Sequence, residues 1–263
     1  MTKEAFEVML SAGEFLWLLA AAGGVETPVH LPLDRMTPSE QKTLQAEGEA
    51  SLRRRGWLQK GPSGQRLDAF LMAVAYGLLS ATDYLRMEHH TRAGFSAFYV
   101  FPWGETAMTV AFSAPSEGEI SSLQLTVYAH PQEALQAAKE RLPDVVAADV
   151  LRSSLPLPQP YVLLPLVWKA PAQAAKILAT RGWEPLHIEQ LLQTLQWYWR
   201  FSLESFRQGA GGVLCGCEEG ACWGAGDDAE ERVSCVPARR AVLEMWLGQQ
   251  WKKMVEGEED GVY

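Results

Sequence analysis

The chain has 263 residues, of which 48% are hydrophobic, 21% charged and 10% aromatic, and its formal net charge is −9. A chain of this size and composition can bury a core that needs no disulfide or metal. The acidic balance disfavours a nucleic-acid partner, because phosphate backbones repel a negative surface. The most apolar stretch, residues 5–24, is interrupted by Glu7, Ser11 and Glu14, so neither a membrane span nor a signal peptide is expected.

Helices are predicted across residues 1–90. Ser11 and Glu14 form the capping-box pattern that starts a first helix. Thr37-Pro38-Ser39-Glu40 starts a second helix, which runs to Arg55, and a third begins near Leu67. The basic run that ends the second helix favours a helix end, where cations complement the macrodipole, over a nucleic-acid contact.

From residue 95 the hydrophobic period changes to two, which is typical of strands. Strands are predicted over 95–101, 106–112 and 122–129, around a tight turn at 102–105, and a helix that Pro131 opens follows to Leu142. The preceding pair His89-His90 is interpreted as the end of a helix, with a structural role.

The second half repeats this order of elements. Its prolines at 156, 158, 160, 165 and 171 predict a crossover with at most an edge strand. The helices and short strands that follow are predicted at 172–180, 188–200, 204–208, 213–217, 221–224 and 232–236, with a last helix opened by Pro237.

Residues 126–131 and 232–237 are each a predicted strand that runs into a proline-led helix. The repeated order predicts an α+β fold of two pseudo-twofold-related α-β-β-β-α halves, which share a mixed or antiparallel sheet, with an N-terminal winged-helix-like helical portion. We place the halves at 1–150 and 151–255, followed by an acidic tail at 256–263.

The four cysteines, Cys215, Cys217, Cys222 and Cys235, lie too close together for a secretory disulfide framework, and a reducing, cytosolic compartment is expected. Their spacing differs from that of zinc knuckles, although a hairpin could bring all four together. Small buried thiols in a core are the favoured interpretation, with a zinc site made of all four cysteines as the alternative.

Two aromatic clusters are the candidate partner-binding residues. Phe101 and Trp103 lie on the first predicted hairpin, whereas Trp197, Trp199 and Phe201 lie at the predicted end of the helix from 188 to 200. Consecutive aromatics spread around a helix, so they cannot all face one core, and exposed aromatics are typical anchors of partner interfaces.

Motifs for catalysis are missing from the sequence: there is no nucleophile elbow, phosphate loop or metalloprotease signature. The glycine-rich segment 209–212 runs into a predicted strand, whereas phosphate loops run into helix N-termini. We therefore expect a binding protein that is not an enzyme and uses no cofactor.

The order of elements resembles the EspG family of cytosolic type VII (ESX) secretion chaperones. The segments that carry the resemblance are LSAGEFLWLL, RRRGWL, LDAFL, FSAFYVFPWGETAMTVAF, GGVLCGCEEGACWG and RVSCVPARRAVLEMWL. The resemblance covers nearly the whole chain. It implies a quasi-twofold sheet with helical subdomains and a helical protein client, a PE–PPE heterodimer whose exposed tip is kept soluble for export.

Two other functions remain open from the sequence. Residues 11–85 could form the winged-helix reader of a ligand-responsive DNA-binding regulator, which requires a basic face. Alternatively, the four cysteines could hold a zinc ion in a zinc-stabilised binding domain.

Overall fold

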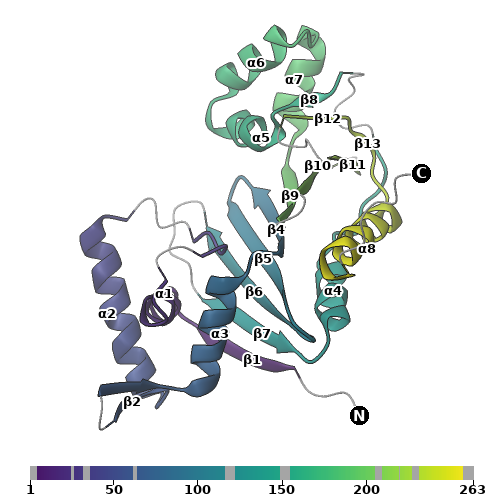
Figure 1. The fold of residues 1–263 in the computed structure, drawn as a ribbon. Coiled ribbons are helices and arrows are strands. Elements are labelled where there is room, and N and C mark those ends of the chain that lie inside the picture. Colours follow the sequence, from purple (N-terminus) through teal and green to yellow (C-terminus); the bar gives the residue numbers. More distant parts are fainter. Residues whose placement is uncertain are drawn as a thin grey trace. The chain divides into compact units, whose positions relative to one another are not determined.

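The computed structural model describes residues 5–24, 27–31, 36–61, 64–115, 122–148, 155–204, 209–218, 220–226 and 231–256 (Figure 1). The chain forms two compact units: Met1–Tyr84 with Phe98–Ala134, called the first unit, and Leu85–Ala97 with Leu135–Tyr263, called the second unit. The predicted boundary at residue 150 follows the sequence repeat and does not coincide with these units. The predicted tail beyond Glu256 and most of the predicted strand 204–208 lie outside the described residues.

The helices are α1 (Ala12–Ala21), α2 (Pro38–Arg54), α3 (Ala69–Ser80), α4 (Pro131–Glu140), α5 (Pro160–Lys169), α6 (Pro171–Thr180), α7 (Pro185–Thr194) and α8 (Arg240–Glu256). The strands are β1 (Phe6–Leu10), β2 (Leu58–Gly61), β3 (Gly64–Leu67), β4 (Tyr84–Thr91), β5 (Gly94–Trp103), β6 (Thr106–Pro115), β7 (Leu123–Tyr128), β8 (Leu157–Pro158), β9 (Trp197–Glu204), β10 (Ala210–Cys217), β11 (Gly220–Gly226), β12 (Arg232–Val233) and β13 (Val236–Pro237).

The main sheet has the strand order β1-β7-β6-β5-β4-β9-β10-β11-β13, and its neighbours β1/β7, β6/β7, β9/β10, β10/β11 and β11/β13 pair antiparallel. Apart from the edge strand β1, the order is symmetric about β4 and β9: β4-β5-β6-β7-α4 has β9-β10-β11-β13-α8 as its counterpart. The predicted α+β class is confirmed, and the order of elements repeats, although the predicted strand 232–236 is divided between β12 and β13, which lie in different sheets. Each repeat contributes four strands to the sheet, one more than the α-β-β-β-α pattern predicts.

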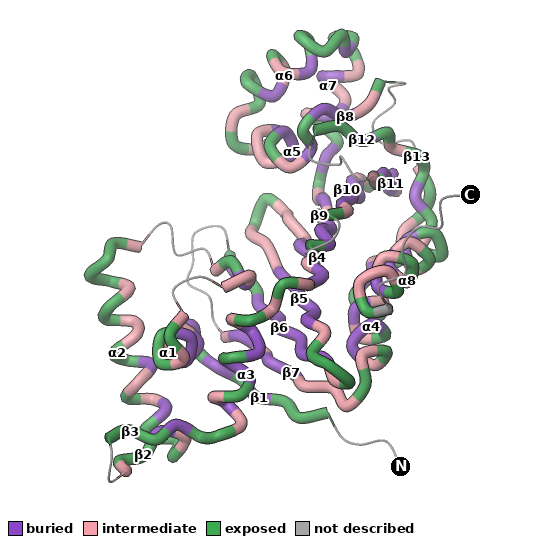
Figure 2. The backbone as a smooth tube through the Cα atoms, in the orientation of Figure 1, coloured by how far each residue is buried: buried purple, intermediate pink, exposed green. Residues whose placement is uncertain are grey.

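In the first unit, local signals start the helices where they were predicted. Both capping boxes form: the Ser11 and Thr37 hydroxyls accept from the backbone amides of Glu14 and Glu40, whose carboxylates accept from the amides of the two cap residues. The hairpin β2-β3 follows α2, and α1 packs against α2 and α3. The strands β5 and β6 carry much of the core, which Figure 2 shows in purple.

In the second unit, helices α5, α6 and α7 contribute to one hydrophobic core with residues of β9, β10, β11 and β12. Helix α8 lies beside α4 (Figure 1), where the Arg240 guanidinium donates to the carbonyls of Lys139 and Leu142 and pairs with the Asp144 carboxylate at 2.6 Å. The antiparallel pair β8-β12 forms a separate two-stranded sheet.

Three predicted elements are corrected by the structure. Residues 84–91, with His89-His90, form strand β4 and not a helix end. The helix predicted over 188–200 ends at Thr194, and the aromatic run after it is strand β9, because large aromatic residues suit a pleated sheet. Pro237 lies in β13, and the last helix begins at Arg240.

Candidate partner-binding surface

The structure separates the five predicted partner-binding residues into core and surface. Phe101 and Phe201 are buried, with exposed fractions of 0% and 1%. The Phe101 ring lies 5.8 Å from the ring of Tyr84 and 6.1 Å from that of Tyr99. These two phenylalanines are therefore core residues, and the prediction that they lie at a partner surface is corrected. Trp103, Trp197 and Trp199 are at least partly exposed.

Strand β9 presents its aromatic residues in alternation. Since successive side chains on a strand point to opposite faces, Trp197, Trp199 and Phe201 share one face, which we call the aromatic face. Its neighbours in register include Leu214, which pairs with Trp199 on one side and with Trp223 on the other. The prediction that these aromatics spread around a helix is therefore wrong, because they form a continuous row on one face of a strand.

The rings of the aromatic face are in contact with one another. Trp199 stacks on His89 of β4, with ring centroids 4.9 Å apart, and on Phe201 at 5.9 Å. Trp246 of α8 lies edge-on to Phe201 at 6.0 Å and to Trp223 at 5.2 Å. Helix α8 thus covers the Phe201 end of the row, whereas Trp197 and Trp199 stay half-buried.

His89 is a member of this surface that sequence reasoning missed. Its ring also lies edge-on to Trp197, with centroids 6.1 Å apart. Burial lowers the pKa of His89, and the charge of His90 lowers it further. The lowered pKa favours the neutral imidazole, which adds to the apolar surface that the two tryptophans present.

Glycines beneath the tryptophans make this packing possible. A Cβ atom at Gly216 would lie 2.0 Å from the Trp197 ring, and one at Gly212 would lie 2.4 Å from that of Trp223. In register, Gly216 pairs with Trp197 and Gly212 pairs with Phe201. The glycines of strand β10 thus leave space for the large rings of neighbouring strands. This packing accounts for the glycine content of the strand, and no phosphate-binding role is needed to explain it.

The opposite face of β4 and β9 carries a buried polar group. The Glu88 carboxylate, 4% exposed, accepts from Arg86 Nε at 2.9 Å and lies 3.3 Å from His90 Nε2. Burial raises the pKa of Glu88, but the hydrogen bond from His90 and the charge and hydrogen bond of Arg86 prevail and lower it to about 2. The His90 ring stacks on Tyr198 at 4.6 Å, and burial is the main cause that raises the Tyr198 pKa. This cluster fixes the strands in place.

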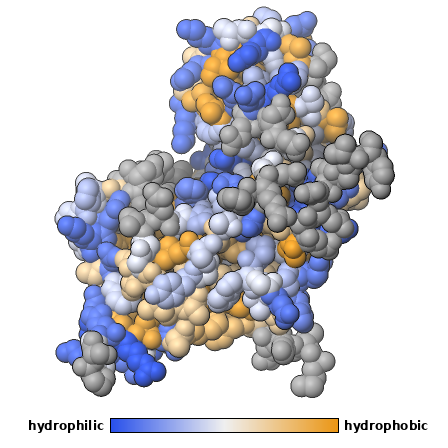
Figure 3. Space-filling model, viewed as in Figure 1, coloured by the Kyte–Doolittle hydropathy of each residue, from blue (hydrophilic) through white to orange (hydrophobic). Residues whose placement is uncertain are grey.

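The first unit offers a second, smaller apolar surface. Trp103 is 37% exposed and packs over α3, where a Cβ at Gly77 would lie 3.2 Å from the indole. Helix α3 has no charged residue, and its Tyr76 is 54% exposed. Figure 3 shows apolar residues, in orange and tan, gathered over the part of this unit where α3 and β1 lie.

The cysteines lie in and beside the core of the second unit. Cys215 and Cys222 are buried and directly opposite each other on β10 and β11, and Cys217 and Cys235 are half-buried against the same core. Within the described parts of the chain, no group of three or more histidine, cysteine or acidic side chains is arranged to hold a metal ion.

Two of the arginines at the end of α2 form contacts with other residues of this chain. Arg53 pairs with Glu49 at 2.7 Å, and Arg55 pairs with buried Glu14 at 3.0 Å while its guanidinium lies 3.5 Å from the centroid of the Trp57 ring. The basic run is thus a helix end, as predicted, and two of its three cations are engaged in contacts within the chain.

The described helices include none with the length and apolar character needed to span a bilayer. The fold belongs to the α+β class and combines helices with one large antiparallel sheet. Searches against protein-family models and against curated proteins give no match.

Among solved structures, the chain is similar to the type VII secretion system chaperone EspG5 of Mycobacterium tuberculosis, in complex with the PE25–PPE41 dimer. The TM-score is 0.55 at 11% identity, over 97% of this chain and 99% of that chain. This likeness shows an EspG-like fold. HtdX from M. tuberculosis, at 10% identity over 89% of this chain and 98% of that chain, has a TM-score of 0.20, which is too low to indicate a shared fold.

Proposed function

We propose that the chain is a non-catalytic chaperone or adaptor that binds a helical protein client in the cytoplasm. The observation that carries this proposal is the EspG-like fold along 97% of the chain. Because that chaperone was solved with a PE25–PPE41 dimer, the proposed client is a helical secretion substrate of the PE–PPE type.

The aromatic face supplies the chemistry that such a client needs. An amphipathic helix presents a stripe of apolar side chains, which bind best to large, rigid, half-exposed rings. Trp197, Trp199 and His89 form this kind of surface on sheet strands, so little conformational entropy is lost on binding. Binding of this kind requires no nucleotide, metal or chemical step.

Trp103 and the uncharged helix α3 are proposed as a second client contact. Trp103 and Tyr76 are exposed aromatics, which partner interfaces use more often than aliphatic residues. The described residues that define the two surfaces include no lysine or arginine. The DNA-binding alternative is not favoured, since Arg53 and Arg55 are paired with carboxylates.

Affinity purification from the source cells, with the wild-type chain and single-residue variants as bait, tests this function. The wild-type chain should recover a helical protein that aggregates when expressed alone and stays soluble when co-expressed with the chain. Trp199→Ala and Trp103→Ala should each reduce recovery at least tenfold, as expected for the loss of about 1.4 kcal/mol or more at an aromatic anchor.

A matched control is Leu186→Ala, which removes another exposed apolar side chain, 62% exposed on α7. It should leave recovery unchanged. The melting temperature of the tryptophan variants should remain close to that of the wild type. Unfolding of those variants would instead make Trp103 and Trp199 core residues, and the absence of any helical partner would overturn the proposed function.

A further inference from the structure

The four cysteines of the second unit gather at one face of the hairpin β10-β11. Cys215 and Cys217 are two residues apart on β10, so their side chains share a face, and Cys222 is the register partner of Cys215 on β11. Cys215 and Cys222 belong to the hydrophobic core on this side, and Cys217 and Cys235 pack against the same core. All four cysteines are reduced in this structure, so four oxidisable thiols lie in one small region.

Cys215 and Cys222 meet the geometric requirement for a disulfide. Residues that face each other across antiparallel strands have Cα atoms about 4.5–5.5 Å apart. Disulfides join Cα atoms that are about 4.4–6.8 Å apart, so the strands need not move. A hydrogen bond already joins the two thiols, and both side chains are buried. Formation of the bond therefore requires only rotation of the two side chains.

The pair lies directly behind part of the aromatic surface. Because successive residues of a strand point to opposite sides, the register partners Leu214 and Trp223 lie on the side of the aromatic face. The Trp223 ring lies 5.2 Å from the ring of Trp246 on α8. A disulfide between Cys215 and Cys222 would thus fix β10 to β11 behind Trp223, and it should stabilise the packing of α8 there.

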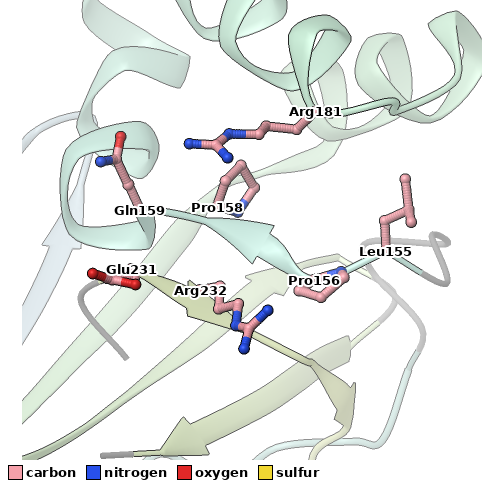
Figure 4. A pocket seen from close by; sticks show the side chains of 7 residues that line it. All are labelled: Leu155, Pro156, Pro158, Gln159, Arg181, Glu231 and Arg232. Carbon is pink, nitrogen blue, oxygen red and sulfur yellow. The ribbon is translucent and has the colours of Figure 1, made fainter. Parts of the chain in front are cut away.

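Cys235 gives a small oxidant access to this pair. It is half-buried and lies between β12 and β13, each a strand of two residues. A Cβ atom at Gly224, two residues after Cys222, would lie 3.1 Å from Cys235 Sγ, so this thiol lies against β11 near the pair. A cavity of about 400 Å³ opens next to β12, with Arg232 in its lining (Figure 4). Solvent therefore reaches the chain segment that leads to Cys235.

We infer that Cys215 and Cys222 form a redox-sensitive pair, which a low-molecular-weight disulfide converts to a cross-strand disulfide through Cys235. The Cys235 thiolate attacks one sulfur of the oxidant, and one oxidant thiol leaves. Cys222 then attacks the Cys235 sulfur and displaces the second oxidant thiol, and Cys215 attacks the Cys222 sulfur and releases Cys235. Each attacking thiol gives up one proton, and each leaving thiolate takes one up. The protein loses two electrons and two protons, and the oxidant becomes two thiols.

The buried thiols reach Cys235 through local opening at the edge of the sheet. Strand β13 is the last in the sheet order, and it pairs with β11 through two residues. So short an edge strand opens at a low free-energy cost, without global unfolding. The exchange between cysteines is intramolecular, so the oxidant itself does not enter the core. A thiol reagent from solution, in contrast, must enter the core to reach Cys215 and Cys222.

Peptide mapping of the full chain after incubation with glutathione disulfide, under native conditions, tests the pair. The remaining thiols are alkylated, and the chain is cleaved after the glutamates that lie between Cys217 and Cys222. The wild type should lose the mass of two hydrogen atoms, and the peptides that contain Cys215 and Cys222 should be joined. Dithiothreitol should reverse both changes. The absence of joined peptides, or a final product that joins Cys222 to Cys217 or to Cys235, would overturn the inference.

Single variants test the route through Cys235. Cys235→Ala should slow formation of the disulfide about tenfold or more. Cys217→Ala removes the other half-buried thiol and is the matched control, which should react at the wild-type rate. In Cys222→Ala, which cannot form the pair, Cys235 should retain bound glutathione. Absence of glutathione from Cys235 in that variant, or a wild-type rate in Cys235→Ala, would refute the route. Since no client enters these measurements, their outcome is independent of the proposed function.

Discussion

Gly216 of β10 and Trp197 of β9 are register partners, and the indole fills the space above the glycine. A Cβ atom at Gly216 would lie 2.0 Å from the Trp197 ring, which is closer than any real contact. The half-exposed end of the aromatic face therefore depends on a residue that has no side chain.

Gly216→Ala should displace the Trp197 indole from the sheet. The methyl group and the ring cannot occupy the same space, so the ring moves toward solvent at a cost of about 1–3 kcal/mol. The change is measured by a red shift of tryptophan emission and a lower urea midpoint. Gly209→Ala is the control, because its Cβ would meet only the Leu203 carbonyl, at 3.9 Å. Wild-type emission and stability in Gly216→Ala would show that Trp197 does not lie there.

The parts of the fold that depend on residues close together in the sequence could be predicted from it. The capping boxes at Ser11 and Thr37 act within four residues, and the turn at Gly104 has a positive φ of 59° that suits glycine. Strand β9 could not be predicted in this way, because no proline or glycine separates it from α7. Its conformation depends on pairing with β4 and β10.

The candidate surface was predicted in part, for the same reason. Trp197 and Trp199 stand out because consecutive large aromatics cannot all be buried by one neighbour. His89 gave no signal, since its contact with Trp199 arises only when β4 and β9 become neighbours in the sheet. Phe201 was wrongly placed at the surface, because nothing local to it shows that Trp246 of α8 covers it.

Glu88→Gln should lower stability and alter its pH dependence. The folded pKa of about 2 lies below the ordinary value of 4.5. The contribution of Glu88 is therefore fully present above about pH 4.5 and is lost as the pH falls toward 2. At neutral pH it is on the order of 3 kcal/mol. Urea unfolding between pH 2.5 and 7 should show a flatter profile in the variant. The exposed Glu105→Gln should match the wild type, and an unchanged profile in Glu88→Gln would refute the charged cluster.

The four thiols should react in two classes. The hydrogen bond with Cys222, burial, and the nearby Cys222 and Cys235 thiols raise the pKa of Cys215, so its thiolate is scarce. In the native protein, Cys217 and Cys235 should react with a thiol reagent first, and Cys215 and Cys222 should react only after unfolding. The Cys217→Ala/Cys235→Ala variant should lose the fast class.

Metal analysis distinguishes core cysteines from a zinc site. Protein purified without added zinc should contain less than about 0.1 zinc per chain, and a chelator should leave the melting temperature unchanged, because buried thiols packed as small apolar groups need no ion. About one zinc per chain, with a chelator-induced loss of structure, would establish the alternative in which the four cysteines hold zinc.

Gly48→Ala should destabilise the first unit, although alanine is the better helix former by about 1 kcal/mol. Helices α1 and α2 meet at two glycines: a Cβ at Gly48 would lie 2.1 Å from the backbone of Gly13, and one at Gly13 would lie 2.2 Å from the Leu44 carbonyl oxygen. The obstacle is backbone and not a movable side chain, so the helices must separate, and Leu52 and Phe15 would lose burial.

The loss in Gly48→Ala should exceed about 2 kcal/mol in urea unfolding. Ala50→Gly on the exposed side of α2 is the matched comparison, and it should cost only the propensity difference of about 1 kcal/mol. Helix propensity alone predicts that Gly48→Ala stabilises the protein and that Ala50→Gly destabilises it. The close packing of α1 on α2 instead predicts that both variants are destabilised and that Gly48→Ala loses more stability. Stabilisation by Gly48→Ala would therefore mean that α1 and α2 do not meet at these glycines.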